Sequence, residues 1–106
     1  MNKIVYGTTR SIKEWQSMVT EWAVSKGFEW TKDDVDTMLL RIHSEVSEAS
    51  EALRDSDGEG FAEEVADIFI RLVNLCEVLG IDLEKEVIKK YNKNLDRPNL
   101  HGRKKK

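Results

Sequence analysis

The sequence has few of the residues that break helices or form disulfides. It contains one proline, one cysteine and six glycines in 106 residues. A single cysteine excludes an internal disulfide, and the scarcity of proline and glycine disfavours a turn-rich β fold. Cys76 falls on the apolar stripe of its expected helix, so we expect a buried thiol with no catalytic role.

Long apolar runs and a basic net charge are also missing. No stretch approaches the roughly 20 apolar residues of a membrane-spanning helix, and residues 1–10 lack the apolar run of a secretion signal. A formal net charge of −3 provides no overall basic field for nucleic acid. We therefore expect a cytoplasmic protein that binds neither membranes nor nucleic acid.

The composition that remains is that of one small helical domain. Hydrophobic residues make up 40% of the chain and charged residues 35%, a balance typical of amphipathic helices. We expect a single domain over residues 1–106, with a lead-in at 1–10 and a flexible basic tail from about 98 to 106. A chain this short buries a modest core, which favours oligomerisation.

Apolar residues recur at three- and four-residue spacing in four segments, which predicts four helices. The expected helices cover about 11–26, 31–54, 61–79 and 82–95, with a loop at 55–60. Gly27 and Gly80 are natural helix ends, and Pro98 blocks further helix. No segment alternates with period two for long enough to predict a strand. Short loops favour antiparallel neighbours, so the predicted fold is all-α, with a four-helix bundle-like protomer.

Two acidic pairs stand on consecutive expected helices. Glu45 and Glu48 form one pair, and Glu64 and Asp67 form the other. Residues three apart share a helix face, and at about 100° per residue both pairs lie at matching offsets from the apolar stripes of their helices. The stripe expected on the second helix consists of Leu39, Ile42, Val46, Ala49 and Leu53. Antiparallel packing of the two helices would bring the pairs together.

Four close carboxylates repel one another unless a cation neutralises them. Their hard oxygen ligands select Mg²⁺, Mn²⁺ or Ca²⁺ rather than Zn²⁺. Spacing alone leaves a second interpretation open, because glutamates are common on solvated helix faces.

Two other metal sites are excluded. The loop at 55–60 resembles the start of an EF-hand, but Ala66 occupies the place of its bidentate glutamate. Neither His43 nor His101 follows a glutamate by three residues, as a di-iron bundle requires.

Three motifs in order resemble those of the MazG-like nucleotide pyrophosphohydrolases, members of the all-α NTP pyrophosphatase superfamily with the dimeric dUTPases and dCTP pyrophosphatases. The motifs are S-E-V-S-E at 44–48, E-E-V-A-D at 63–67 and K-K-Y-N-K-N-L-D-R-P-N-L-H-G-R-K at 89–104. Residues 15–28 also resemble the family's opening helix, so the similarity covers about residues 11–104. One departure is visible: the family's first motif usually begins with two glutamates, and Ser44 stands at the first place.

The resemblance implies Mg²⁺-dependent hydrolysis of a nucleoside triphosphate to the monophosphate and pyrophosphate, with Mn²⁺ as a substitute and cleaning of the nucleotide pool as the role. It implies that the metal ligands and catalytic residues are Glu45, Glu48, Glu64 and Asp67. It also implies a homodimer or a dimer of dimers whose sites draw on more than one subunit.

The resemblance also gives the basic third motif a function. Lys90, Asn94 and Arg97 are the expected phosphate- and sugar-binding residues, and a solvated basic tail is the alternative. Trp22, Trp30 and Phe28 are expected to stack on the base, and Gln16 is a weaker candidate for reading its edge. For the aromatic residues the alternative is a place in the core.

Two other functions fit the same sequence. One is a non-catalytic helical interaction module, whose amphipathic helices and basic tail would contact a partner. The other is a related phosphohydrolase whose substrate lies outside the nucleotide pool.

Overall fold

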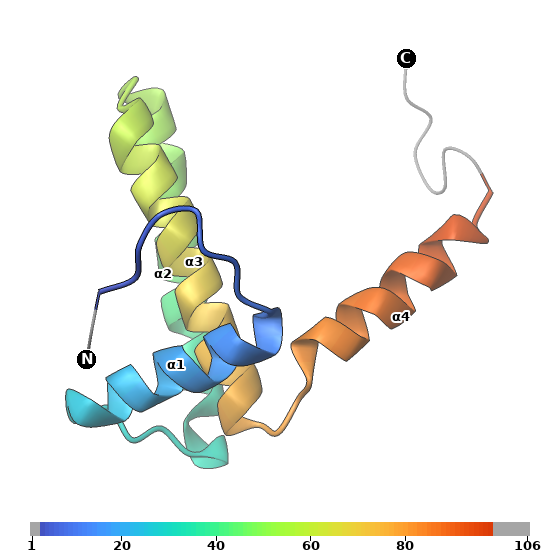
Figure 1. Ribbon diagram of the computed structural model, residues 1–106. Coiled ribbons are helices and arrows are strands. Elements are labelled where there is room, and N and C mark those ends of the chain that lie inside the picture. The colour runs from blue at the N-terminus through green and yellow to red at the C-terminus, as the bar shows by residue number, and fades with distance from the viewer. Residues whose placement is uncertain (1–2, 99–106) are drawn as a thin grey trace.

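The computed structural model describes residues 3–98, and this part of the chain is all helical, as predicted. The helices are α1 (Ile12–Ser25), α2 (Val35–Arg54), α3 (Gly58–Val78) and α4 (Leu83–Leu95), with a short 3-10 turn, η1 (Lys32–Asp34), before α2. Helices α2 and α3 run side by side, α1 crosses α3, and α4 leads away from them (Figure 1). Within the described residues, no helix is both long and apolar enough to cross a membrane.

Local sequence signals set most helix ends. Ser11 and Glu14 form the predicted capping box of α1, with hydrogen bonds of 2.8 and 3.1 Å between side chain and backbone in both directions. Thr31 begins η1 in the same way, and α2 follows directly. Gly27 and Gly80 have φ of 91° and 71°, the left-handed conformation that ends α1 and α3.

The connection between α2 and α3 is shorter than predicted. Helix α3 begins at Gly58 because the carboxylate of Asp57 accepts a hydrogen bond from the Gly60 N–H at 2.9 Å. Only three residues are left between the helices, and Ser56 adopts a φ of 57° to make the turn. This tight turn holds α2 and α3 antiparallel, which places their acidic pairs on facing helices.

The buried face of α2 matches the predicted stripe only at Ala49 and the half-buried Ile42. Met38, Glu45 and Ala49 are the buried residues of α2, whereas Leu39, Val46 and Leu53 are 49%, 47% and 64% exposed. The contact with α3 therefore lies to one side of the most apolar stripe. Glu45 is part of this contact, and Arg71 of α3 pairs with it there at 3.2 Å. Apolar periodicity therefore predicted only part of the buried face of α2.

Helices α1 and α3 share the rest of the core. Val73 is fully buried, and Cys76 is a buried free thiol, as predicted. Trp15 and Phe69 meet edge to face, with ring centroids 6.3 Å apart. The hydroxyl of Thr20 donates to Oδ1 of the buried Asn74 at 2.9 Å, so a polar contact fixes α1 against α3.

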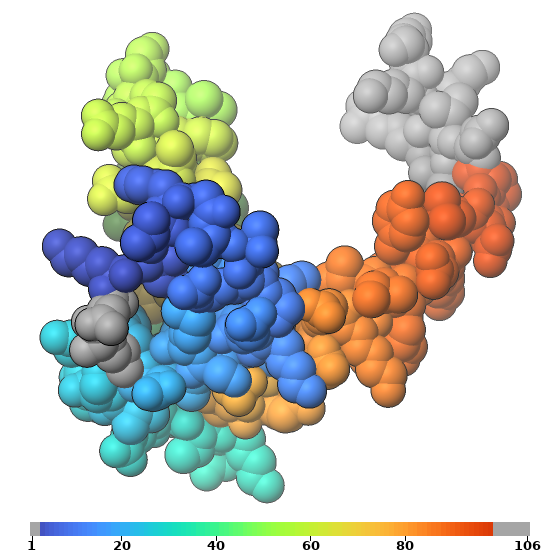
Figure 2. Space-filling view, viewed as in Figure 1, coloured from blue at the N-terminus to red at the C-terminus, as the bar shows by residue number. Residues whose placement is uncertain are grey.

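Helix α4 is anchored only at its beginning. The amide of Gln16 donates to the Ile81 carbonyl at 2.8 Å and accepts from the Leu83 N–H at 3.1 Å. Beyond this anchor α4 has no buried residue, and its atoms stand clear of α2 and α3 (Figure 2). The described part of the chain is therefore a three-helix unit with a projecting fourth helix, more open than the predicted bundle.

Candidate functional site

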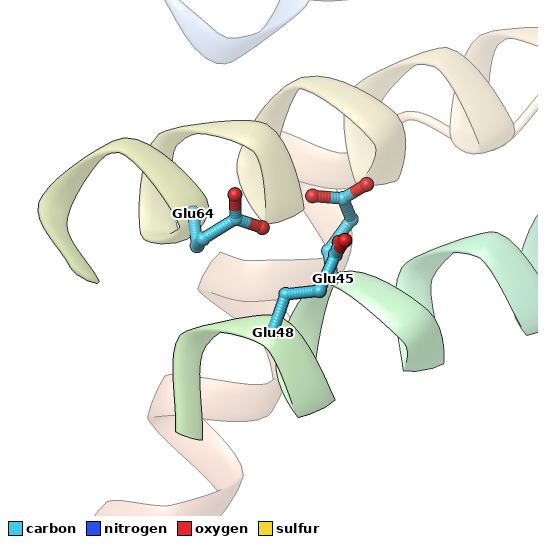
Figure 3. Close-up of side chains that lie close together, drawn as sticks. All are labelled: Glu45, Glu48 and Glu64. Carbon is cyan, nitrogen blue, oxygen red and sulfur yellow. The ribbon is translucent and has the colours of Figure 1, made fainter. Parts of the chain in front are cut away.

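Three carboxylates meet between α2 and α3. One oxygen from each of Glu45, Glu48 and Glu64 lies within 4.8 Å of the other two, and Figure 3 shows Glu64 facing the two glutamates of α2. We call these three residues the carboxylate cluster. The two glutamates of α2 are three residues apart, so both project toward α3. The predicted meeting of acidic residues from the two helices is thus present for three of the four.

The members of the carboxylate cluster differ in exposure. Glu45 is buried, Glu64 is half-buried and Glu48 is exposed. Arg71 Nε donates to Glu45 Oε1 at 3.2 Å, with side-chain exposures of 37% for the arginine and 12% for the glutamate. The cluster therefore opens to solvent beside Glu48 and is partly neutralised beside Glu45.

The electrostatics of Glu64 reflect this crowding. Its pKa is raised to about 7. Hydrogen bonding to the Glu45 carboxyl is the largest cause, followed by desolvation and the charges of Glu45, Glu48 and Asp67. Its Oε2 is buried and has no hydrogen-bond partner among the described residues. A carboxylate oxygen in this situation gains strongly from any cation placed beside it.

These features fit a hard divalent cation. The cluster offers oxygen ligands only, which Mg²⁺ and Mn²⁺ accept and Zn²⁺ disfavours. Glu64 has a buried oxygen without a hydrogen-bond partner among the described residues, and Glu48 is exposed, so solvent reaches one side of the cluster. Glu45, Glu48 and Glu64 are thus the residues that would hold the cation.

Asp67 lies outside the carboxylate cluster. Its charge is close enough to help raise the pKa of Glu64, but its carboxylate is not among the oxygens that lie within 4.8 Å of one another. Instead, Asp67 lines two pockets that α1 and α3 share. A ligand role for Asp67 stays a prediction, and its position also suits contact with a bound substrate.

The three predicted base-stacking residues line one pocket next to the cluster. Phe28 and Trp30 stack with ring centroids 5.9 Å apart, and the guanidinium of Arg41 lies 5.3 Å from the Trp30 ring. Trp22, 46% exposed, forms another wall. The pocket has a volume of about 150 Å³, and Asp67, Arg71 and Asn74 also line it. Aromatic surface and the acidic cluster are thus adjacent.

A larger, mostly apolar pocket of about 710 Å³ shares part of its lining with this one. Lys3 and Ile4 of the N-terminal segment close it against α1 and α3. Trp22 and Asp67 line both pockets. The two pockets are therefore neighbours, and both offer apolar surface to a ring.

Gln16 and the basic residues lie away from the carboxylate cluster. Gln16 is 2% exposed, and its amide is engaged with the α3–α4 connection. Its position therefore supports a role in anchoring α4, and we do not include it among the residues proposed to contact substrate.

Lys90 and Asn94 are on the projecting α4 and Arg97 follows it, all exposed. In the single chain, α4 projects away from α2 and α3, the helices that carry the cluster (Figure 1). The remainder of the basic motif, including Arg103 and Lys104, lies outside the described residues.

Three polar residues of the smaller pocket were not predicted from the sequence: Arg41, Arg71 and Asn74. A signal for two of them was present. Arg71 follows Glu64 by seven residues and Asn74 follows Asp67 by seven, so each lies two turns along the same helix face. Arg41 is recognisable only from the fold, because its partner Trp30 lies in a different segment.

An antiparallel helix pair with clustered carboxylates, flanked by an aromatic pocket, defines an all-α protein with a candidate cation site. The family is identified by comparison with known domains. The model of the MazG nucleotide pyrophosphohydrolase domain matches residues 33–101, and the chain belongs to this family. Comparisons with curated proteins and with solved structures gave no match.

Proposed function

We propose that this protein hydrolyses a nucleoside triphosphate between the α- and β-phosphates, releasing the monophosphate and pyrophosphate, with Mg²⁺ bound at the carboxylate cluster. The observation that supports this most directly is the convergence of Glu45, Glu48 and Glu64 within 4.8 Å in a chain of the MazG family. Cleaning of the nucleotide pool is the proposed role.

The chain's own residues divide the chemistry between two places. The carboxylate cluster would hold the cation, which when bound neutralises phosphate oxygens and favours ionisation of water. A carboxylate of α2, Glu45 or Glu48, would accept the proton of the attacking water. Trp22, Phe28 and Trp30 would hold the base, and Asp67 would stand between base and phosphates as a ligand or a substrate contact.

The test is pyrophosphate release over a panel of canonical and damaged nucleoside triphosphates. We expect turnover of at least one of them with Mg²⁺ or Mn²⁺, no turnover with excess EDTA, and recovery when Mg²⁺ is restored. Binding of Mg²⁺ with a nucleotide should also raise the melting temperature, because both favour the native state. Absence of turnover over the whole panel would contradict the proposal and favour the interaction module.

We further propose that the active protein is at least a homodimer, in which α4 of one protomer packs on its partner. Val87, Ile88, Tyr91 and Leu95 give α4 an apolar face that is 48–66% exposed. The uncovered leucines and valine of α2 offer a second apolar face on the same chain. Mutual burial of such faces is favourable, and it would carry Lys90, Asn94 and Arg97 toward a partner's site.

Replacing Tyr91 with serine tests this assembly. We expect the variant to lose the dimer at micromolar concentration and to lose activity with it, because a large apolar contact becomes polar. Sedimentation velocity gives the mass directly. Lys93→Ser, on the opposite face of α4, is the matched control and should keep the wild-type mass. A monomeric wild-type protein with full activity would refute the assembly but not the chemistry.

A further inference from the structure

We propose that Arg71 is the resident counter-cation of the carboxylate cluster. It would release Glu45 when a divalent cation binds, and then pair with a phosphate oxygen of the nucleotide. The inference rests on the proposed function, because it assigns a switching residue to the same site.

The position of Arg71 supports both halves of this proposal. It projects from α3 at the junction of two features: Nε donates to Glu45 of the cluster at 3.2 Å, and the side chain lines the pocket of Trp22, Phe28 and Trp30. Among the described residues, no other cationic side chain forms an ion pair with the cluster. Arg71 therefore supplies the nearest positive charge to three mutually repelling carboxylates.

The contact is poorly suited to holding Glu45 in one orientation. Arginine fixes a carboxylate best through two parallel hydrogen bonds of about 2.7–2.9 Å, whereas Arg71 makes one bond of 3.2 Å from a side chain that is 37% exposed. The positive charge of Arg71 affects a cation bound at Glu45 whether or not the hydrogen bond is well aligned. A divalent cation on Glu45 would be repelled by the neighbouring guanidinium, because charges a few ångströms apart interact strongly near a protein surface.

The aromatic pocket is where the Arg71 guanidinium would lie after it leaves Glu45. The Arg71 side chain already lines this pocket, where Arg41 lies over the Trp30 ring, so the guanidinium released from Glu45 would remain beside the pocket. A nucleotide with its base in this pocket and its phosphates toward the cluster would pass Arg71. Guanidinium groups match phosphate oxygens in geometry and charge. Substrate phosphate thus replaces Glu45 as the partner of Arg71.

The first measurement is Mn²⁺ binding to the nucleotide-free protein, followed by electron paramagnetic resonance of free Mn²⁺. We expect Arg71→Gln to bind Mn²⁺ about tenfold more tightly than wild type, because a competing charge is gone. Arg71→Lys, which keeps the charge, should remain close to wild type. The matched control is Arg54→Gln on α2, whose guanidinium donates to Ser50 outside the cluster and which should not change Mn²⁺ affinity.

The second measurement is binding of α,β-methylene deoxynucleoside triphosphates at saturating Mn²⁺. These analogues resist cleavage between the α- and β-phosphates. We expect Arg71→Gln to bind them about tenfold more weakly, by a similar factor for all four bases, with partial rescue in Arg71→Lys. Tighter metal binding together with weaker nucleotide binding is a pair of effects that local damage to the fold would not produce.

The outcomes separate the inference from the proposed function. Weaker Mn²⁺ binding by Arg71→Gln would mean that Arg71 supports Glu45 as a ligand, and unchanged Mn²⁺ or nucleotide binding would mean that it does not switch. Each result overturns the inference and leaves the proposed function standing. Failure of both wild type and Arg71→Gln to bind Mn²⁺ at millimolar concentration would instead remove the cation site, and with it both proposals.

Discussion

Replacement of Glu48 by glutamine is expected to reduce pyrophosphate release by at least about a hundredfold, more than the loss usual for residues that only support a metal ligand. Glu48 is the exposed member of the carboxylate cluster. Glutamine keeps its size but removes the charge that would hold the cation. Because the side chain is exposed, the variant should fold normally. The initial rate of pyrophosphate release at saturating Mg²⁺ measures the effect.

Glu51→Gln is the matched control for this experiment. Glu51 is exposed on the same helix, three residues further along, and is outside the carboxylate cluster. It loses the same charge, so a general dependence on acidic surface would affect both variants equally. We expect Glu51→Gln to retain activity within about twofold, as is usual for surface changes. Comparable activity of Glu48→Gln and wild type would refute catalysis at the cluster.

The helices were predictable because their signals are local. The Ser11–Glu14 capping box and the glycines at 27 and 80 act within one turn of chain, so the sequence carries them in full. The orientation of α2 was less predictable. Its most apolar stripe contains Leu39, Val46 and Leu53, yet these residues are exposed in the single chain. Periodicity indicates how apolar a helix face is, but the face that α3 covers depends on how the two helices pack in three dimensions.

The site was predictable to the extent that it depends on spacing. Glu45 and Glu48, three residues apart on α2, lie close to Glu64 of the facing α3, as expected. Asp67 did not join them and instead lines the two pockets beside α1. Contacts between segments that are distant in the sequence leave no regular residue spacing from which they could be predicted. The aromatic pocket combines Trp22 of α1, Phe28 of a loop and Arg71 of α3, and only the fold brings these together.

The proton on Glu64 should make cation binding depend on pH. Its pKa of about 7 lies above the ordinary value of 4.5, so near pH 5 the folded, cation-free protein holds a proton that a bound cation must displace. Mn²⁺ affinity should therefore rise with pH between 5 and 7, by up to about tenfold per pH unit for one released proton, and level off above 7. Titrations of Mn²⁺ at pH 5, 6, 7 and 8 measure this directly.

The same proton predicts the pH dependence of folding without metal. A raised pKa in the folded state contributes stability that is complete below about 4.5 and is lost as pH rises through about 7. In EDTA, wild type should therefore lose more thermal stability between pH 5 and pH 8 than Glu64→Gln, which has no proton to lose. Glu63→Gln removes the adjacent, exposed charge on α3 and should follow wild type. Parallel losses in wild type and Glu64→Gln would show that crowding in the cluster does not hold a proton on Glu64, and that the three carboxylates are further apart in solution.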